Sequence, residues 1–213
     1  MDHTPRAMVP FFIDLSEQAC LVVGAGRVAE RKIQTLLAAG AALTVIAPDA
    51  TPRIRELAQD QSLDWHERTY RDGEASDYFL TVAAASDQAA NERVSRDARD
   101  AGRLVNVVDV PDLSNIYASA VVQRGELQIA VSTSGACPAL AKRLREEMEA
   151  RFPESYGPLL SRLRRFRAGL RDAITDPAER KAILDRVARS DELARFLDGN
   201  EAPLEDLLTR CAS

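Results

Sequence analysis

The chain has 213 residues, with 28 Lys and Arg against 33 Asp and Glu, which gives a net charge of −5. This balance argues against a general nucleic-acid-binding protein. The hydrophobic fraction of 46% is enough for a buried core. No apolar run approaches the ~20 residues needed to span a bilayer, and no signal-peptide pattern opens the chain. We therefore expect a cytoplasmic protein that binds neither nucleic acid nor membranes.

No metal site or disulfide framework is predicted. The cysteines, Cys20, Cys137 and Cys211, are odd in number and far apart, as expected for a reduced compartment. The two histidines, His3 and His66, are too few and too separated for a histidine metal site.

The first predicted element is a buried strand, Cys20–Val23, and the motif Gly24-x-Gly26-x-x-Ala29 follows it directly. A strand, this glycine pattern and then a helix form the order of a dinucleotide fingerprint. Gly24 permits the tight turn, and Gly26 lets the backbone approach a pyrophosphate. Ala29 keeps the helix close to the sheet, and the amides at the helix start face the phosphates.

The first half continues as an alternation of strands and helices. Strands are predicted over 20–23, 43–46, 64–69, 78–84 and 104–108, and helices over 28–39, 54–61 and 88–100. In the first helix Val28, Leu36 and Leu37 are expected to face the core, with Gly40 as the C-terminal cap. Such alternation predicts an α/β, Rossmann-like fold with a parallel sheet and right-handed crossovers.

The second half changes character after Pro111-Asp112. Runs over 116–122 and 126–132, joined by Gln123-Arg124-Gly125, predict a hairpin. Because a lone hairpin is marginal in water, we expect it to pack on the sheet or on a second copy of the chain, in a homodimer. Pro138 then starts a helix with an apolar stripe at a spacing of four residues, made by Leu140, Leu144 and Met148.

From residue 154 onward the chain is helical, charged and broken by prolines. The predicted division therefore has three parts. They are an NAD-binding Rossmann domain over 1–112, a dimerisation and substrate-contacting region over 113–152, and a helical C-terminal domain over 153–213.

Several blocks in a fixed order carry a family resemblance. They are Phe11-Phe12-Ile13-Asp14-Leu15, the glycine motif, Ala83-Ala84-Ala85-Ser86-Asp87 with Asn91, Asn106-Val107-Val108-Asp109, Ile129 to Gly135, and Pro138-Ala139-Leu140-Ala141. Over residues 9 to 151 the chain resembles the N-terminal module of siroheme synthase. The same module occurs alone as precorrin-2 dehydrogenase, with or without sirohydrochlorin ferrochelatase activity.

The resemblance implies NAD-dependent oxidation of precorrin-2 to sirohydrochlorin, and leaves open whether ferrous iron is also inserted to give siroheme. It places the family's essential aspartate at Asp109. This residue follows a predicted strand, where a doubly wound fold places its site, and its carboxylate can act as a general base. The alternative is a turn residue before Pro111.

The expected cofactor residues lie at the ends of predicted strands. They are Gly24, Gly26, Arg27, Val28, Pro48, Asp49, Ser86, Asp87 and Asn106. Asp49 follows the second strand, where an acidic residue accepts the ribose hydroxyls of NAD. Asp49 can equally be a solvent-facing turn residue, and the nearby Arg53 keeps NADP open.

The substrate carries eight carboxylates, so hydroxyl, amide and basic groups are expected around it. The candidates are Ser132, Thr133, Ser134, Gly135, Arg124 and Lys142, with Arg31, Lys32 and Arg143 as further basic groups. For any one basic residue the alternative is a solvated helix face. Two other functions stay open: a nucleotide-sensing regulatory protein, and an unrelated NAD-dependent dehydrogenase.

Overall fold

The computed structural model describes residues 8–200 and 202–212. The chain divides into two compact units, residues 1–118 and residues 119–213. The predicted division by role, with boundaries after residues 112 and 152, stays a prediction. Within the described ranges, none of the helices combines the length and the apolar character needed to cross a membrane.

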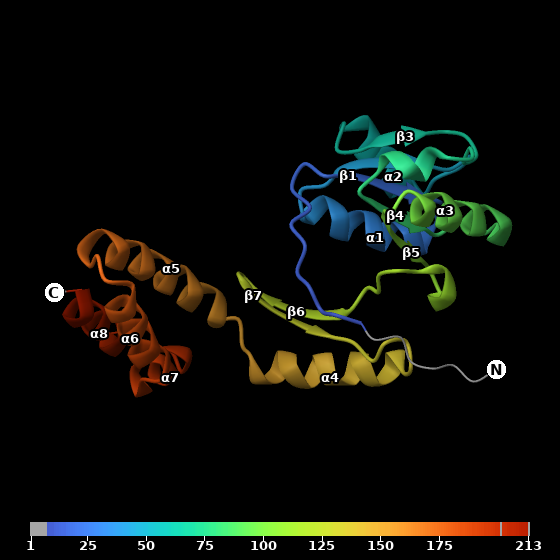
Figure 1. Cartoon of the computed structure of the whole chain (residues 1–213). Helices are drawn as coiled ribbons and strands as arrows, with labels where there is room; N and C mark the ends of the chain where they lie inside the picture. The colour runs from blue at the N-terminus through green and yellow to red at the C-terminus, as the bar shows by residue number, and fades with distance from the viewer. Residues whose placement is uncertain (1–7, 201, 213) are drawn as a thin grey trace. The chain divides into compact units, whose positions relative to one another are not determined.

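The first unit is a five-stranded sheet in the order β3-β2-β1-β4-β5, and every strand pair in it is parallel. The strands are β1 (Ala19–Val23), β2 (Ala42–Ile46), β3 (Asp64–His66), β4 (Leu80–Ala83) and β5 (Leu104–Val107). Helices α1 (Arg27–Ala38), α2 (Pro52–Gln59) and α3 (Gln88–Asp100) connect them (Figure 1), together with the short 3-10 helices η1 (Glu74–Asp77) and η2 (Pro111–Leu113). This arrangement confirms the predicted α/β fold.

Side-chain alternation along β1 gives the sheet two apolar faces. Cys20 and Val22 pack with α1 and α2 on one face, whereas Leu21 and Val23 pack with α3 on the other. All four side chains are buried, as expected for a strand covered on both faces. Burial raises the pKa of the Cys20 thiol to about 11, so this cysteine is an unreactive core residue.

Helix α1 differs from its prediction at one position. Leu36 is buried and Leu37 partly buried, but Val28 is 51% exposed. The core positions of the helix are instead Ala29, Ile33 and Leu36, at spacings of four and three residues. Val28 lies on the first turn, beside the glycine motif.

The strand predicted over 116–122 begins later than expected, at Ala120. Residues Asn115 and Ile116 instead lie against β5, where both backbone amides donate to the carbonyl of Val105, at 3.0 and 3.3 Å. This pairing draws the segment up to Ala118 into the first unit. The predicted strand over 64–69 is also shorter, because the chain turns after His66, whose carbonyl accepts from the amide of Arg68 at 2.8 Å.

The second unit begins with an antiparallel hairpin of β6 (Ala120–Arg124) and β7 (Leu127–Val131). The connection is a two-residue turn at Gly125 and Glu126, with Arg124 paired to Leu127. Helix α4 (Pro138–Arg151) packs on this hairpin. The predicted stripe is only half buried on α4, where Leu140 is exposed and the buried residue is Ala141.

A bundle of four helices completes the second unit: α5 (Tyr156–Ala173), α6 (Pro177–Ala188), α7 (Asp191–Leu197) and α8 (Ala202–Ala212). Its core includes the buried residues Leu159, Val187, Phe196 and Leu204. The bundle has its own apolar cluster, separate from the two clusters of the sheet.

Candidate active site

A crevice of about 730 Å³ lies at the carboxyl ends of the parallel strands. Its walls come from the turn between β1 and α1, the ends of β2 and β5, the segment after β3, and the loop between β4 and α3. After β1 the chain adds β2 and β3 on one side of the sheet, and then returns to add β4 and β5 on the other side. Open α/β sheets bind their ligands at such a switch point, here between β1 and β4.

Gly24 makes the tight turn at the end of β1. Its φ of +105° lies in a region that residues with a side chain rarely adopt. A Cβ atom there would lie 2.8 Å from the backbone nitrogen of Ala85 and closer still to the carbonyl of Ala84. Gly24 is therefore required by the fold of the crevice itself.

Replacing Gly24 with alanine should destabilise the first unit by about 3 kcal/mol or more, because backbone strain adds to a clash with the backbone of Ala84 and Ala85, just after β4. Chemical denaturation measures this loss, with Gly26→Ala as the matched control. A Gly24→Ala protein as stable as the control would contradict the close approach of the two strand ends.

Gly26 is different, because the fold does not require a glycine there. Its φ of −82° and ψ of −176° suit any residue, and a Cβ atom at this position would meet nothing within 4 Å. It is the N-cap of α1 and provides no side-chain hydrogen bond to the first turn. The free space and the uncapped amides together fit an anionic group such as a pyrophosphate.

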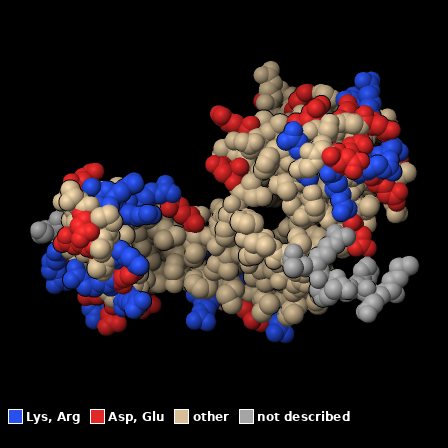
Figure 2. Space-filling view, viewed as in Figure 1, with Lys and Arg blue, Asp and Glu red and all other residues tan. Residues whose placement is uncertain are grey.

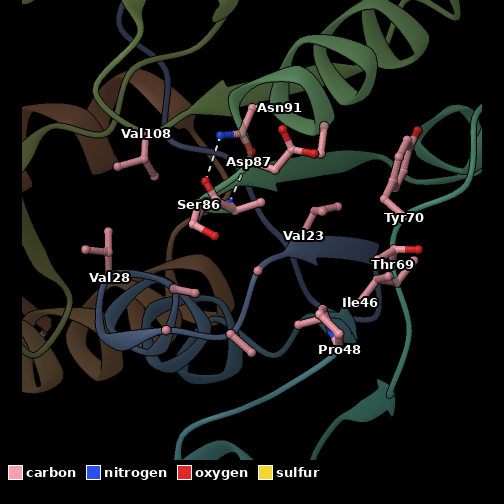
Figure 3. Close-up of a pocket in the computed structure, with 18 of the residues that line it drawn as sticks. Val23, Val28, Ile46, Pro48, Thr69, Tyr70, Ser86, Asp87, Asn91 and Val108 are labelled. Carbon is pink, nitrogen blue, oxygen red and sulfur yellow. Dashed lines mark hydrogen bonds between the residues drawn. The ribbon is translucent and has the colours of Figure 1, made fainter.

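The loop between β4 and α3 forms the next wall. The carboxylate of Asp87 caps α3 by accepting from the amide of Ala89 at 3.0 Å. Asn91 is buried, and its side-chain amide both accepts from and donates to the backbone of Ala85, at 3.1 and 2.9 Å (Figure 3). These bonds hold Ser86 and Asp87 at the crevice, where both line it.

Pro48 and Asp49, after β2, also line the crevice. The Asp49 side chain is 82% exposed, accepts from the amide of Ala50 at 2.7 Å and pairs with Arg55. Asp49 is thus both a turn residue and a crevice residue. Arg53 pairs with Glu56 at 3.0 Å and does not line the crevice.

Asp109 follows β5 and lines the same crevice. Its φ of +59° is left-handed, a conformation that aspartate tolerates better than most residues. Lys32 on α1 lies within electrostatic range of this carboxylate. Burial lowers the pKa of Lys32, Arg31 adds to that effect, and Asp109 opposes it. The Asp109 carboxylate therefore lines the crevice, and the half-buried Lys32 ammonium lies near it, although Lys32 itself is not among the lining residues.

Some crevice residues were missed by sequence reasoning. Thr69 and Tyr70 line the side opposite Val28 and Val108 (Figure 3), and Arg93 also lines the crevice. The Tyr70 hydroxyl donates to Asp97 at 2.6 Å, and burial raises its pKa. If the third strand had been predicted to end at His66, Thr69 and Tyr70 would have been candidates, because ligands bind beyond strand ends.

Asn106 is not among the residues that line the crevice. Its side-chain amide donates to the carbonyl of Ile116 at 3.2 Å and ties β5 to the segment that runs beside it. The amide is therefore already engaged on the side of β5 where residues 115 and 116 lie.

The expected substrate-contacting residues belong to the second unit. The segment from Ser132 to Gly135 leads into α4, and the Thr133 hydroxyl accepts from the amide of Cys137 at 3.2 Å. Lys142 is exposed on α4, 3.9 Å from Glu146. Arg124 has a structural use, because its guanidinium donates to the carbonyls of Phe152 and Glu149 at the end of α4, at 2.9 and 3.4 Å.

Among the described residues, no group of three or more His, Cys, Asp and Glu side chains could hold a metal ion. His3 lies outside the described residues, and His66 forms a pair with Asp64 at 2.8 Å.

Comparisons with known proteins agree with this geometry. The family described as "Putative NAD(P)-binding" matches residues 11–120, just over half of the chain. The family described as "Sirohaem biosynthesis protein central" matches residues 124–151. The chain therefore belongs to a family of NAD(P)-binding proteins.

The relatives narrow this class. Siroheme synthase of Azotobacter vinelandii is 37% identical over 200 residues, which are 94% of this chain and 43% of that protein. Siroheme synthase 1 of Klebsiella pneumoniae is 36% identical over 94% of this chain and 42% of its own length. The chain thus spans about two fifths of the length of these curated relatives.

A solved structure matches over nearly the whole chain. SirC, precorrin-2 dehydrogenase, superimposes with a TM-score of 0.83 and 29% sequence identity, over 96% of this chain and 98% of that one. The chain is a member of the family that comprises the siroheme synthase N-terminal module and precorrin-2 dehydrogenase, as the sequence resemblance predicted.

Proposed function

We propose that this chain oxidises precorrin-2 to sirohydrochlorin with NAD. A hydride and a proton leave precorrin-2, and the products are sirohydrochlorin, NADH and H⁺. The observation that carries the proposal is the meeting, in one crevice, of an open glycine at a helix start and a carboxylate held on left-handed backbone. The match to SirC over nearly its whole length supports it.

The crevice residues fit the cofactor by their positions. Gly26 and the uncapped amides of α1, beginning at Arg27, would hold the pyrophosphate. Asp49 would accept from the ribose hydroxyls beyond β2. Val28 and Val108 give the opposite end of the crevice an apolar wall. When bound, NAD supplies the hydride acceptor.

The chain's own residues move the proton. Asp109 lines the crevice with its carboxylate at the end of β5, and we assign it the proton that precorrin-2 loses. The left-handed backbone at Asp109 is the kind of strained position that occurs at functional sites. Lys32 and Arg31 bring positive charge to this end of α1, where they can attract a substrate that carries carboxylates.

Two features of the crevice favour NAD over NADP. Asp49 stands where a 2′-phosphate would be repelled, and Arg53 is engaged with Glu56 outside the crevice. Purified protein with precorrin-2 should therefore form sirohydrochlorin with NAD, more slowly with NADP, and not at all without either. Formation that needs neither nucleotide would exclude the proposal. Adding ferrous iron as a second substrate separates sirohydrochlorin from siroheme by absorbance, and so tests iron insertion independently.

We also propose a homodimer formed through the β6–β7 hairpin. Helix α4 packs on the hairpin, whose buried residue is Val122, whereas Val121 on the alternate face is 44% exposed. A two-stranded sheet with an open face gains stability when a second copy covers it. The cytoplasmic location remains a prediction from the sequence.

Sedimentation of the purified chain at micromolar concentration should show a dimer. Val121→Glu should shift it toward monomer, because a charge would be buried in the interface. Gln123→Glu introduces the same charge two residues along the same face of β6, at the hairpin end, and should have the smaller effect. A stable monomer of the unmodified chain would contradict this proposal.

A further inference from the structure

A second cavity, of about 440 Å³, lies between α5 and α6 in the helical bundle. Four of its lining residues are cationic: Arg167 and Arg171 from α5, and Arg180 and Lys181 from α6. The acidic residue in the lining is Asp185. The cavity lining is therefore positively charged, although the chain as a whole has a net charge of −5. In Figure 2, Lys and Arg side chains gather over the part of the helical bundle that Figure 1 labels α5.

These positive charges are only partly offset by the protein. Arg180 donates to the carbonyls of Ile174 and Thr175, at 2.6 and 2.8 Å. Within the described part of the chain, Arg167, Arg171 and Lys181 have no ion-pair partner. Arg167 and Arg171 are four residues apart on one helix, a spacing at which like charges repel. The repulsion would be relieved by an anion bound between them.

The rest of the lining is apolar. Leu170 is fully buried, and Leu184 and Pro177 complete the apolar part of the cavity. An apolar floor under a rim of guanidinium groups suits a ligand whose body is a hydrocarbon ring and whose edge carries several carboxylates. A nucleic-acid backbone would use the cations and leave the floor without a role.

We propose that this cavity, distinct from the crevice at the carboxyl ends of the sheet, binds the carboxylate-bearing edge of a tetrapyrrole. The volume suits one edge of the macrocycle rather than the whole ring. This inference rests on the proposed function for the identity of the ligand. It adds a docking site in which precorrin-2 or sirohydrochlorin is held by charge, away from the reacting groups.

The test uses uroporphyrin, a stable porphyrin with eight carboxylates, titrated calorimetrically at low salt. Arg171→Glu should bind one uroporphyrin fewer per chain than the unmodified protein, or bind it at this site at least ~10-fold more weakly, because the substitution replaces an attractive charge with a repulsive one. Arg165→Glu is the matched control, because Arg165 is exposed on the same helix and does not line the cavity.

Both variants should keep the maximal rate of NADH formation with precorrin-2, because neither residue is in the crevice. Equal uroporphyrin binding by the Arg171→Glu and Arg165→Glu proteins would overturn the docking site, whatever the rate. Loss of binding of a short single-stranded RNA in Arg171→Glu, with uroporphyrin binding unchanged, would overturn it in favour of nucleic acid. If the unmodified protein forms no NADH from NAD and precorrin-2, but the Arg171→Glu protein still binds uroporphyrin more weakly than the unmodified one, the proposed function is refuted and the docking site is supported.

Discussion

Replacing Asp109 with asparagine should reduce the oxidation of precorrin-2 by ~100-fold or more, the scale of a positioned general acid or base. Binding of NAD and of the tetrapyrrole should persist, because it rests on the glycine turn and on basic groups. Asparagine tolerates the left-handed backbone at this position about as well as aspartate. The variant therefore removes the base and leaves the backbone conformation in place.

Asp109→Ala should lose the same activity and also some stability, because alanine is disfavoured at a positive φ. The two variants together distinguish a catalytic role of Asp109 from a role in stabilising the turn. If iron insertion is present, it should fall with both, since it also removes protons from the macrocycle. Near-normal oxidation of precorrin-2 by Asp109→Asn would show that Asp109 is only a turn residue.

The Gly26→Asp protein should lose NAD affinity by at least ~100-fold, which corresponds to about 3 kcal/mol. The new carboxylate would occupy the space beside the α1 amides, where the pyrophosphate is expected, and would repel it. The fold should survive, since a Cβ atom at Gly26 meets nothing within 4 Å. Calorimetric titration with NAD measures the loss, and thermal unfolding checks the fold.

Two controls make the Gly26 test specific. Gly26→Ala fills part of the same space without a charge and should weaken NAD binding less. Gly169→Asp adds the same charge at another glycine with open space, on α5 in the second unit, and should leave NAD affinity unchanged. Unchanged NAD affinity in the Gly26→Asp protein would contradict the assignment of the glycine motif as the pyrophosphate site.

The parallel sheet could be predicted from the sequence because β1, β2 and β4 are largely apolar and buried, and the turns carry strong local signals. The helix over 88–100 was predicted with its observed bounds, since Asp87 is a good N-cap. Strand ends were less predictable. The run over 116–122 is β-rich, yet Ile116 at its start lies along β5 with Asn115, because the amides of these two residues donate to the carbonyl of Val105. No local pattern encodes this contact.

The residues of the candidate active site were also only partly predictable from the sequence. Gly24, Gly26 and Asp109 stand at strand ends, so the fold rule alone gathers them in one crevice. Tyr70 and Arg93 were missed because they reach the crevice from an irregular segment and from the middle of a helix. Arg124 looked like a substrate contact by charge, but its guanidinium is turned to the carbonyls at the end of α4. The sequence alone does not show which group the Arg124 guanidinium contacts.

We propose above all that one crevice couples precorrin-2 oxidation to NAD reduction. The most direct measurement is a single-turnover reaction of purified protein with precorrin-2 and NAD, in which NADH and sirohydrochlorin are followed together by absorbance. The two products should appear at the same rate and in equal amounts, and both rates should fall together in Asp109→Asn. Sirohydrochlorin that accumulates without NADH, or with an unchanged rate in Asp109→Asn, would contradict this proposal.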